Sequence, residues 1–162
     1  MADNSINNIN KQLQKYTDRP ISLRCRKPQD LEVVSSLLQD ALVGNADLRF
    51  EKSKNNFLFV ANRFCWEVAT KISKDKSYYR VLSGVNVQNV TSVKHKNLSQ
   101  YKDENLASFY NLLTIEYDSD KNEVTLVFAQ NISVKLIVSE LDIFIRDIAV
   151  PYPTTQIPNH FV

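Results

Sequence analysis

The sequence of 162 residues contains only two glycines, Gly44 and Gly84. Glycine is the residue that most readily adopts positive backbone φ angles and that lets a ligand approach the main chain closely. Phosphate-binding loops, dinucleotide-binding fingerprints and the nucleophile turn of serine hydrolases each need several such positions in one short stretch. The sequence therefore excludes these three kinds of site.

The balance of charges argues against a nucleic acid or a membrane surface that would be bound through the net charge of the protein. Twenty Lys and Arg residues face eighteen Asp and Glu residues, so the formal net charge is +2. Basic residues are mostly interleaved with acids, whereas a nucleic-acid or membrane-surface protein usually concentrates them on one face. A hydrophobic fraction of 43% is typical of a globular domain of this length.

The two cysteines, Cys25 and Cys65, are far apart in the sequence. Free thiols in a reducing compartment are the simplest interpretation of this pattern. No apolar run approaches the roughly 20 residues of a membrane-spanning helix, and the chain does not start with a secretory signal pattern. We therefore expect a cytoplasmic protein without a membrane span.

The first half of the chain predicts a polar tail followed by strand, helix and strands. Residues 1–19 are polar and asparagine-rich and are interpreted as an N-terminal tail. Alternation over 21–25 predicts a strand, and Pro28 suits the first turn of a helix that ends at Gly44 as a left-handed cap. Alternation around Leu48 and the continuous apolar run over 57–61, which is expected to be buried on both faces, predict a hairpin with its turn at 54–56. Two more strands follow between Tyr79 and Val93, with Gly84 as a bend or bulge.

The second half predicts three short strands and a closing helix. Apolar residues alternate over 113–117, 124–128 and 134–138, and the connections at 118–122 and 130–131 are turns. Ser139 and Asp142 then resemble a capping box, and Asp142 and Asp147 are expected to act as caps or surface charges on a helix that Pro151 ends. Residues 151–162 are expected to form an extended, proline-containing tail.

These elements predict one α+β domain over residues 20–150. The short turns imply antiparallel pairing, and the helices must cover the apolar side of the sheet. We expect a curved antiparallel sheet or small barrel with one helix in the N-terminal half and a C-terminal helix. The last three strands and the helix resemble the end of a pleckstrin-homology-like domain.

The most unusual stretch is Asn62-Arg63-Phe64-Cys65-Trp66-Glu67. On a strand, Asn62, Phe64 and Trp66 share one face, and Arg63 and Glu67 share the other. One interpretation is a binding patch in which Asn62, Arg63 and Glu67 recognise a polar ligand beside Trp66. The alternative is structural, with Trp66 as a packing centre and with Arg63 and Glu67 paired to each other or to a neighbouring strand.

Catalytic and metal-binding patterns are weak throughout. A nucleophilic Cys65 would need a base, and only His95 and His160 are available. The few cysteines and histidines lack the paired spacing of a zinc site, and Asp118 and Asp120 lack the later glycine and glutamate of a calcium loop. We therefore predict no catalytic residue, no metal and no cofactor.

Two further functions stay open. Basic and aromatic residues could converge on one side of the sheet to bind RNA or anionic lipid; these residues are Lys52, Lys54, Arg63, Lys71, Lys74, Lys76, Tyr78, Tyr79, Arg80, Lys94, Lys96 and Tyr101. An enzyme with a dispersed site, using Glu67 or His160, would show a deep polar pocket with shifted pKa values. The favoured hypothesis is a non-enzymatic binding or adaptor module that uses its sheet surface or edge and that binds a protein partner or a second copy of itself.

Several segments resemble an alphaproteobacterial family known as domain of unknown function 2948. The segments are 30–41, 62–67, 111–115, 126–129, 134–136 and 158–160, and the Asn-Arg-Phe-x-Trp-Glu block at 62–67 is the most specific. The sequence departs from the family pattern at Cys65, where the family has an acid, and at the turn 130–131, which is glycine-rich in the family. The resemblance implies a bacterial cytoplasmic protein and implies no known activity.

Overall fold

The computed structural model describes residues 20–69, 78–98 and 108–158. The helices are α2 (Pro28–Leu38) and α3 (Trp66–Ala69), with 3-10 turns η1 (Asn45–Asp47) and η2 (Lys52–Lys54). The strands in the first half are β1 (Ser22–Cys25), β2 (Ala41–Gly44), β3 (Arg49–Glu51), β4 (Asn56–Phe64), β5 (Tyr78–Val87) and β6 (Val90–Lys96). The remaining strands are β7 (Phe109–Asp118), β8 (Glu123–Phe128), β9 (Ile132–Val138), β10 (Ile143–Asp147) and β11 (Tyr152–Thr154).

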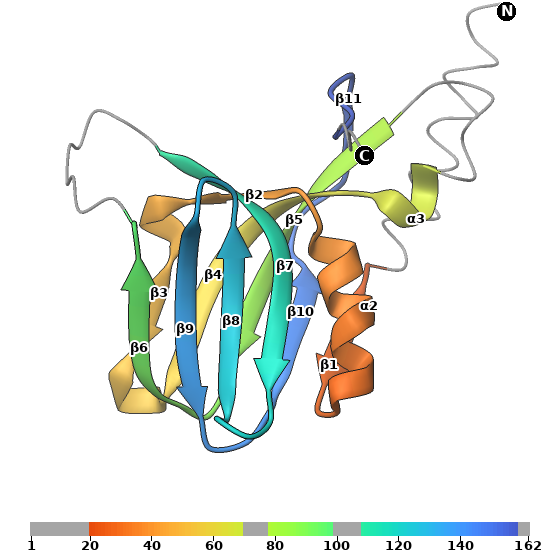
Figure 1. The fold of residues 1–162 in the computed structure, drawn as a ribbon. Coiled ribbons are helices and arrows are strands. Elements are labelled where there is room, and N and C mark those ends of the chain that lie inside the picture. Colours follow the sequence, from red (N-terminus) through yellow and green to blue (C-terminus); the bar gives the residue numbers. More distant parts are fainter. Residues whose placement is uncertain (1–19, 70–77, 99–107, 159–162) are drawn as a thin grey trace, which may run out of the picture.

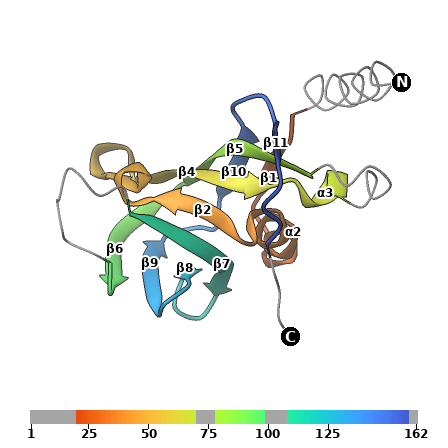
Figure 2. The same cartoon turned by 90° about the horizontal axis from the view of Figure 1, so that it is seen from above.

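All these strands belong to one antiparallel sheet, in the order β1-β10-β5-β4-β2-β7-β8-β9-β6. β3 pairs with β4, and β11 pairs with β5. The sheet folds back on itself, so that β10, β5 and β4 lie opposite β7, β8 and β9 (Figures 1 and 2). Among the described strands, β1 and β6 are the two ends and do not pair, so the predicted curved sheet is confirmed as an open sheet rather than a closed barrel.

The core lies between the two halves of the folded sheet. β4 turns Phe57, Phe59 and Ala61 inward, and β8 and β9 alternate in the same way. Helix α2 buries Leu31, Val34 and Leu38 against this core and lies beside β7 (Figure 1). The period of two in the strands and the apolar stripe of α2 therefore converge on one hydrophobic interior.

Residues other than glycine occupy the turn positions that need a positive φ angle. Asn55, Asn89, Asn122, Gln130 and Asn131 all have positive φ angles, and neither glycine does. The short side chain of asparagine can hydrogen-bond locally, which makes the left-handed region accessible. The turns predicted at 54–56, 118–122 and 130–131 are confirmed in position.

The predicted C-terminal helix is wrong. Residues Ile143–Asp147 form strand β10, which pairs with β1 on one side and with β5 on the other. Ile143 and Ile145 face the core, in alternation with Phe144 and Arg146. The apolar spacing fits both a helix and a strand, and pairing between two strands decides the outcome.

The predicted first helix extends too far. It ends at Leu38, and residues Ala41–Gly44 form β2 between β4 and β7. The positive φ angle falls at Asp40 instead of at the predicted cap Gly44, whose φ is −72°. Gly84 forms no bulge, because the pairing of β5 with β4 and β10 continues through it without a shift of register.

Candidate functional site

The unusual block 62–67 spans the end of β4 and the start of α3. Arg63 continues the inward row of Phe57, Phe59 and Ala61, whereas Asn62 lies on the opposite, outer face of the sheet. The strand ends at Phe64, so Trp66 starts a helical turn rather than continuing the strand. The structure therefore separates the predicted site residues instead of presenting them on one surface.

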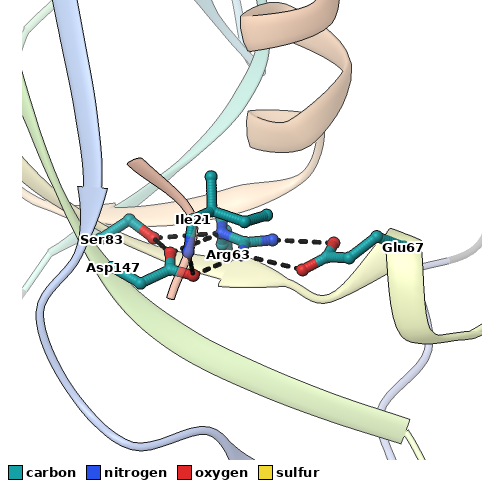
Figure 3. A network of polar contacts seen from close by, with 5 residues as sticks. All are labelled: Ile21, Arg63, Glu67, Ser83 and Asp147. Atoms are coloured by element: carbon teal, nitrogen blue, oxygen red, sulfur yellow. Dashed lines mark hydrogen bonds and ion pairs between the residues drawn. The ribbon is translucent and has the colours of Figure 1, made fainter. Parts of the chain in front are cut away.

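Arg63 has no exposed side-chain surface and lies between two carboxylates (Figure 3). Its Nε and Nη2 donate to Asp147 at 3.0 and 2.8 Å, and its Nη1 and Nη2 donate to Glu67 at 3.0 and 2.9 Å. Such paired, charge-assisted hydrogen bonds exploit the fixed fork of the guanidinium. This geometry matches the structural interpretation of the block, in which Arg63 and Glu67 bind each other.

Asp147 is the centre of this network. The hydroxyl of Ser83 donates to it at 2.6 Å, and the backbone N–H of Ile21 donates at 3.1 Å. Burial pushes the pKa of Asp147 upward, but the hydrogen bonds from Arg63 and Ser83, together with the charge of Arg63, outweigh it, so the pKa lies below its ordinary value. The expectation that Asp147 is a helix cap or surface charge is wrong, because the residue is 5% exposed.

Asp142 also departs from its expected role as a helix cap or surface charge. It is buried and receives hydrogen bonds of 2.9 and 2.7 Å from Arg24 on β1. The hydrogen bond from Arg24 lowers the pKa of Asp142 against the opposing effect of burial. Both aspartates therefore hold the first strand, or the residue just before it, against the rest of the sheet.

Trp66 attaches the end of β4 to the end of α2. Its indole N–H donates to the carbonyl of Gln39 at 3.1 Å, and its ring meets Phe64 edge-on at 4.6 Å between centroids. The guanidinium of Arg80 lies over the ring of Phe64, 5.9 Å from its centroid, and donates to the carbonyl of Asn62. These contacts fix the backbone on which Asn62 is displayed.

The outer face of β10, β5, β4, β2 and β7 is the surface that displays Asn62; we call it the outer face. Pairing sets its residues in three rows across the strands. The rows are Phe144-Asn86-Leu58, then Arg146-Gly84-Val60, and then Leu82-Asn62-Leu42-Asn111. The pair Gly44-Phe109 comes one residue after Val43, the last residue of β2 that pairs with β4, and extends the middle row beyond Val60. Helix α2 packs on the other side of the sheet, where its apolar residues join the core.

The middle row of the outer face, which we call the glycine row, holds both glycines of the chain. A Cβ on Gly44 would lie 2.7 Å from a carboxylate oxygen of Asp47, which ends an exposed side chain that can move aside, so crowding does not require this glycine. A Cβ on Gly84 would meet its nearest atom, in Ile148, at the ordinary contact distance of 3.6 Å. Neither backbone strain nor crowding within the described chain requires glycine at position 84.

Polar atoms without partners flank the glycine row. The side-chain oxygens of Asn62, Asn86 and Asn111 are buried and accept no hydrogen bond from any residue that the structure describes. The amide nitrogen of Asn62 reaches the hydroxyl of Tyr152 at 2.6 Å. Buried acceptors of this kind are rare in folded proteins and call for an explanation. Exposed apolar side chains accompany them, with Leu82 at 38% and Phe109 at 63%.

The other candidate residues are dispersed. Cys25 and Cys65 are buried and form no disulfide, and burial raises the pKa of the Cys25 thiol to about 11. His95 is exposed on β6, and His160 lies outside the described residues. No group of three potential ligands for a metal ion occurs in the described ranges.

The basic residues do not gather on one surface within the described ranges. Arg63 and Arg80 are buried, while Lys94 and Lys96 lie at the far end of β6 from Lys52 and Lys54. Lys71, Lys74, Lys76 and Tyr101 fall outside the described residues.

Comparison with protein families matches residues 21–160 to a family described as protein of unknown function (DUF2948). The chain belongs to this family. The match confirms the resemblance found from the block 62–67 and extends over almost the whole described chain. Neither the curated proteins nor the solved structures contain a match. None of the described helices is both long and apolar enough to cross a membrane.

Proposed function

We propose that this protein is a non-enzymatic binding module whose outer face recognises a protein partner in the bacterial cytoplasm. The observation that carries the proposal is Gly84 in the middle row of that face. A glycine inside a strand costs roughly 0.5–1 kcal/mol relative to alanine, and nothing in the described chain needs it there. Close approach of another molecule to the strand is a reason for such a glycine.

The neighbours of Gly84 support the same use. The oxygens of Asn62, Asn86 and Asn111 lie on both sides of the glycine row, but they are buried, so a partner reaches them only if neighbouring side chains move. A partner that covers Leu82 and Phe109 would bury exposed apolar surface on the same face. Asn62 and Trp66 thereby keep a part in binding, Asn62 by contact and Trp66 by holding the strand end. Arg63 and Glu67 act only through the backbone that they fix.

Site-specific photo-cross-linking tests the proposal. A photoreactive phenylalanine analogue at position 82 should capture a partner, or a second copy of the chain, in cells of the source organism. The same analogue at position 125, on the half-buried outer side of β8, is the matched control. Equal cross-linking from both positions, or none from position 82, would exclude the outer face as the binding surface.

The alternatives have less support. Binding of nucleic acid would rest on Lys94, His95 and Lys96 at one end of β6 and on Lys52 and Lys54 near the other, because Arg63 and Arg80 are buried. An enzyme would need a shifted acid or base in a pocket, and the shifted carboxylates Asp142 and Asp147 are both engaged by arginines.

A further inference from the structure

A second surface lies where α2 meets β7, away from the glycine row. Residues of both elements line a cleft of about 560 Å³, with Pro28, Glu32 and Ser35 on the helix and Thr114, Glu116 and Tyr117 on the strand. Figure 1 shows the two elements side by side at the right of the molecule. The cleft combines a helix wall with a strand wall, an arrangement that can receive an extended segment between them.

The strand wall is an open sheet edge. β2 pairs with β7 only from Phe109 to Leu112, whereas β8 follows β7 as far as Asp118. A shift of register between Leu112 and Thr114 marks the point where the two neighbours part. Within the described chain, no strand pairs with residues 113–118 on the side that faces α2.

Among the described residues, α2 hydrogen-bonds this edge through Ser35, whose hydroxyl also pairs with the hydroxyl of Thr114 at 2.9 Å. The backbone N–H of Ile115 donates to the hydroxyl of Ser35 at 3.0 Å, so the backbone of Ile115 faces α2 rather than β8. Residues of an antiparallel strand alternate in the side to which their backbone groups point. The carbonyl of Ile115 and both backbone groups of Tyr117 therefore face the cleft, and these groups can pair with an added strand.

The negative charge of the cleft favours an occupant with a basic side chain. Glu32 on α2 and Glu116 on β7 are both exposed, and no Lys or Arg belongs to the lining. A cationic side chain placed between the two walls would meet a carboxylate from either side. Such exposed pairs favour one partner over others more than they raise affinity.

We propose that this cleft binds an extended peptide segment that contains Lys or Arg and adds to β7 as a short strand along Ile115–Asp118. The backbone of the segment pairs with Ile115 and Tyr117, and its basic side chain lies between Glu32 and Glu116. This site is independent of the outer face, so the protein can hold two partners and act as an adaptor.

Selection from a random nonapeptide library displayed on phage, with the full-length protein as bait, tests this site. Enriched peptides should contain Lys or Arg among alternating apolar residues. Binding of a synthesised enriched peptide should weaken about tenfold in Glu32→Lys and in Glu116→Lys, because attraction becomes repulsion. The matched control is Glu140→Lys, an exposed glutamate between β9 and β10, which should bind as the unmodified protein does.

Amide spectra of the protein with the same peptide locate the contact. The signals of Ile115 and Tyr117 should shift, and hydrogen exchange at the Tyr117 amide should slow, because that N–H gains an acceptor. The proposal is overturned if the library gives no enriched peptide, or if enriched peptides lack basic residues. It is also overturned if peptides bind both charge-reversed variants as tightly as Glu140→Lys, or leave the amides of residues 115–118 unshifted.

Discussion

The guanidinium of Arg63 on β4 reaches past β5 to the carboxylate of Asp147 on β10, through hydrogen bonds of 3.0 and 2.8 Å. Ser83 on the intervening strand donates to the same carboxylate, so three neighbouring strands share one polar cluster. The cluster lies on the inward side of the sheet, where the rest of β4 buries apolar residues. It therefore fixes the strand end that displays Asn62.

Replacement of Arg63 by methionine should destabilise the protein by about 3–5 kcal/mol, because Asp147 would keep a buried charge without its main partner. Urea unfolding measures the loss. The control is Arg146→Met, which replaces the exposed arginine next to Asp147 on β10. This variant should change the free energy of unfolding by no more than about 0.5 kcal/mol. A cost below about 1 kcal/mol for Arg63→Met would show that the cluster does not support the fold.

The stability of the protein should depend on pH through Asp147. The folded-state pKa of Asp147 lies below its ordinary value of 3.8, so the group contributes stability that is fully present above that pH. This contribution is lost as the pH falls through the folded pKa. Urea unfolding at a series of acidic pH values should give a steeper decline for the unmodified protein than for Asp147→Asn. Parallel curves would contradict the role of this carboxylate.

Trp66→Phe should cost about 1 kcal/mol, because the carbonyl of Gln39 loses the indole N–H while the aromatic contact with Phe64 is largely kept. Circular dichroism must follow the unfolding, since Trp66 is the only tryptophan of the chain. An unchanged midpoint would mean that solvent replaces the hydrogen bond without loss.

Ser35→Ala should destabilise the protein by about 1–3 kcal/mol, because the N–H of Ile115 loses its acceptor at the contact between α2 and β7. The adjacent Ser36 is the matched control, since its hydroxyl only donates to the carbonyl of Glu32 on the exposed side of the helix. Thermal unfolding of both alanine variants measures the difference. Equal midpoints would show that Ser35 does not hold the two elements together.

The sequence predicted the parts of the fold that local patterns determine. A continuous apolar run located the strand over 57–61, apolar alternation located those over 124–128 and 134–138, and asparagine marked the turn at Asn55. Prediction from the sequence failed where the same apolar residues fit both the period of a helix and the period of a strand. Phe144, Ile145 and Ile148 fit a helical stripe, yet Ile143 and Ile145 also alternate, and pairing with β1 and β5 favours the strand.

The site was predictable only in its local part. Arg63 and Glu67 are four residues apart, so their pairing could be proposed from the sequence. Asp147 lies 84 residues from Arg63, and only the order of the strands brings the two together. Gly84 was predicted only as a bend or bulge, and its place beside Val60 on the outer face follows from the register of β4 and β5.

The most direct test of the outer face replaces Gly84 by alanine and measures folding and binding in the same preparation. The partner captured from position 82 should bind at least about tenfold more weakly, whereas the free energy of unfolding should stay unchanged or rise by up to about 1 kcal/mol. Tight binding by the variant would contradict the account. A loss of stability would contradict it as well, because it would show that the fold itself needs the glycine.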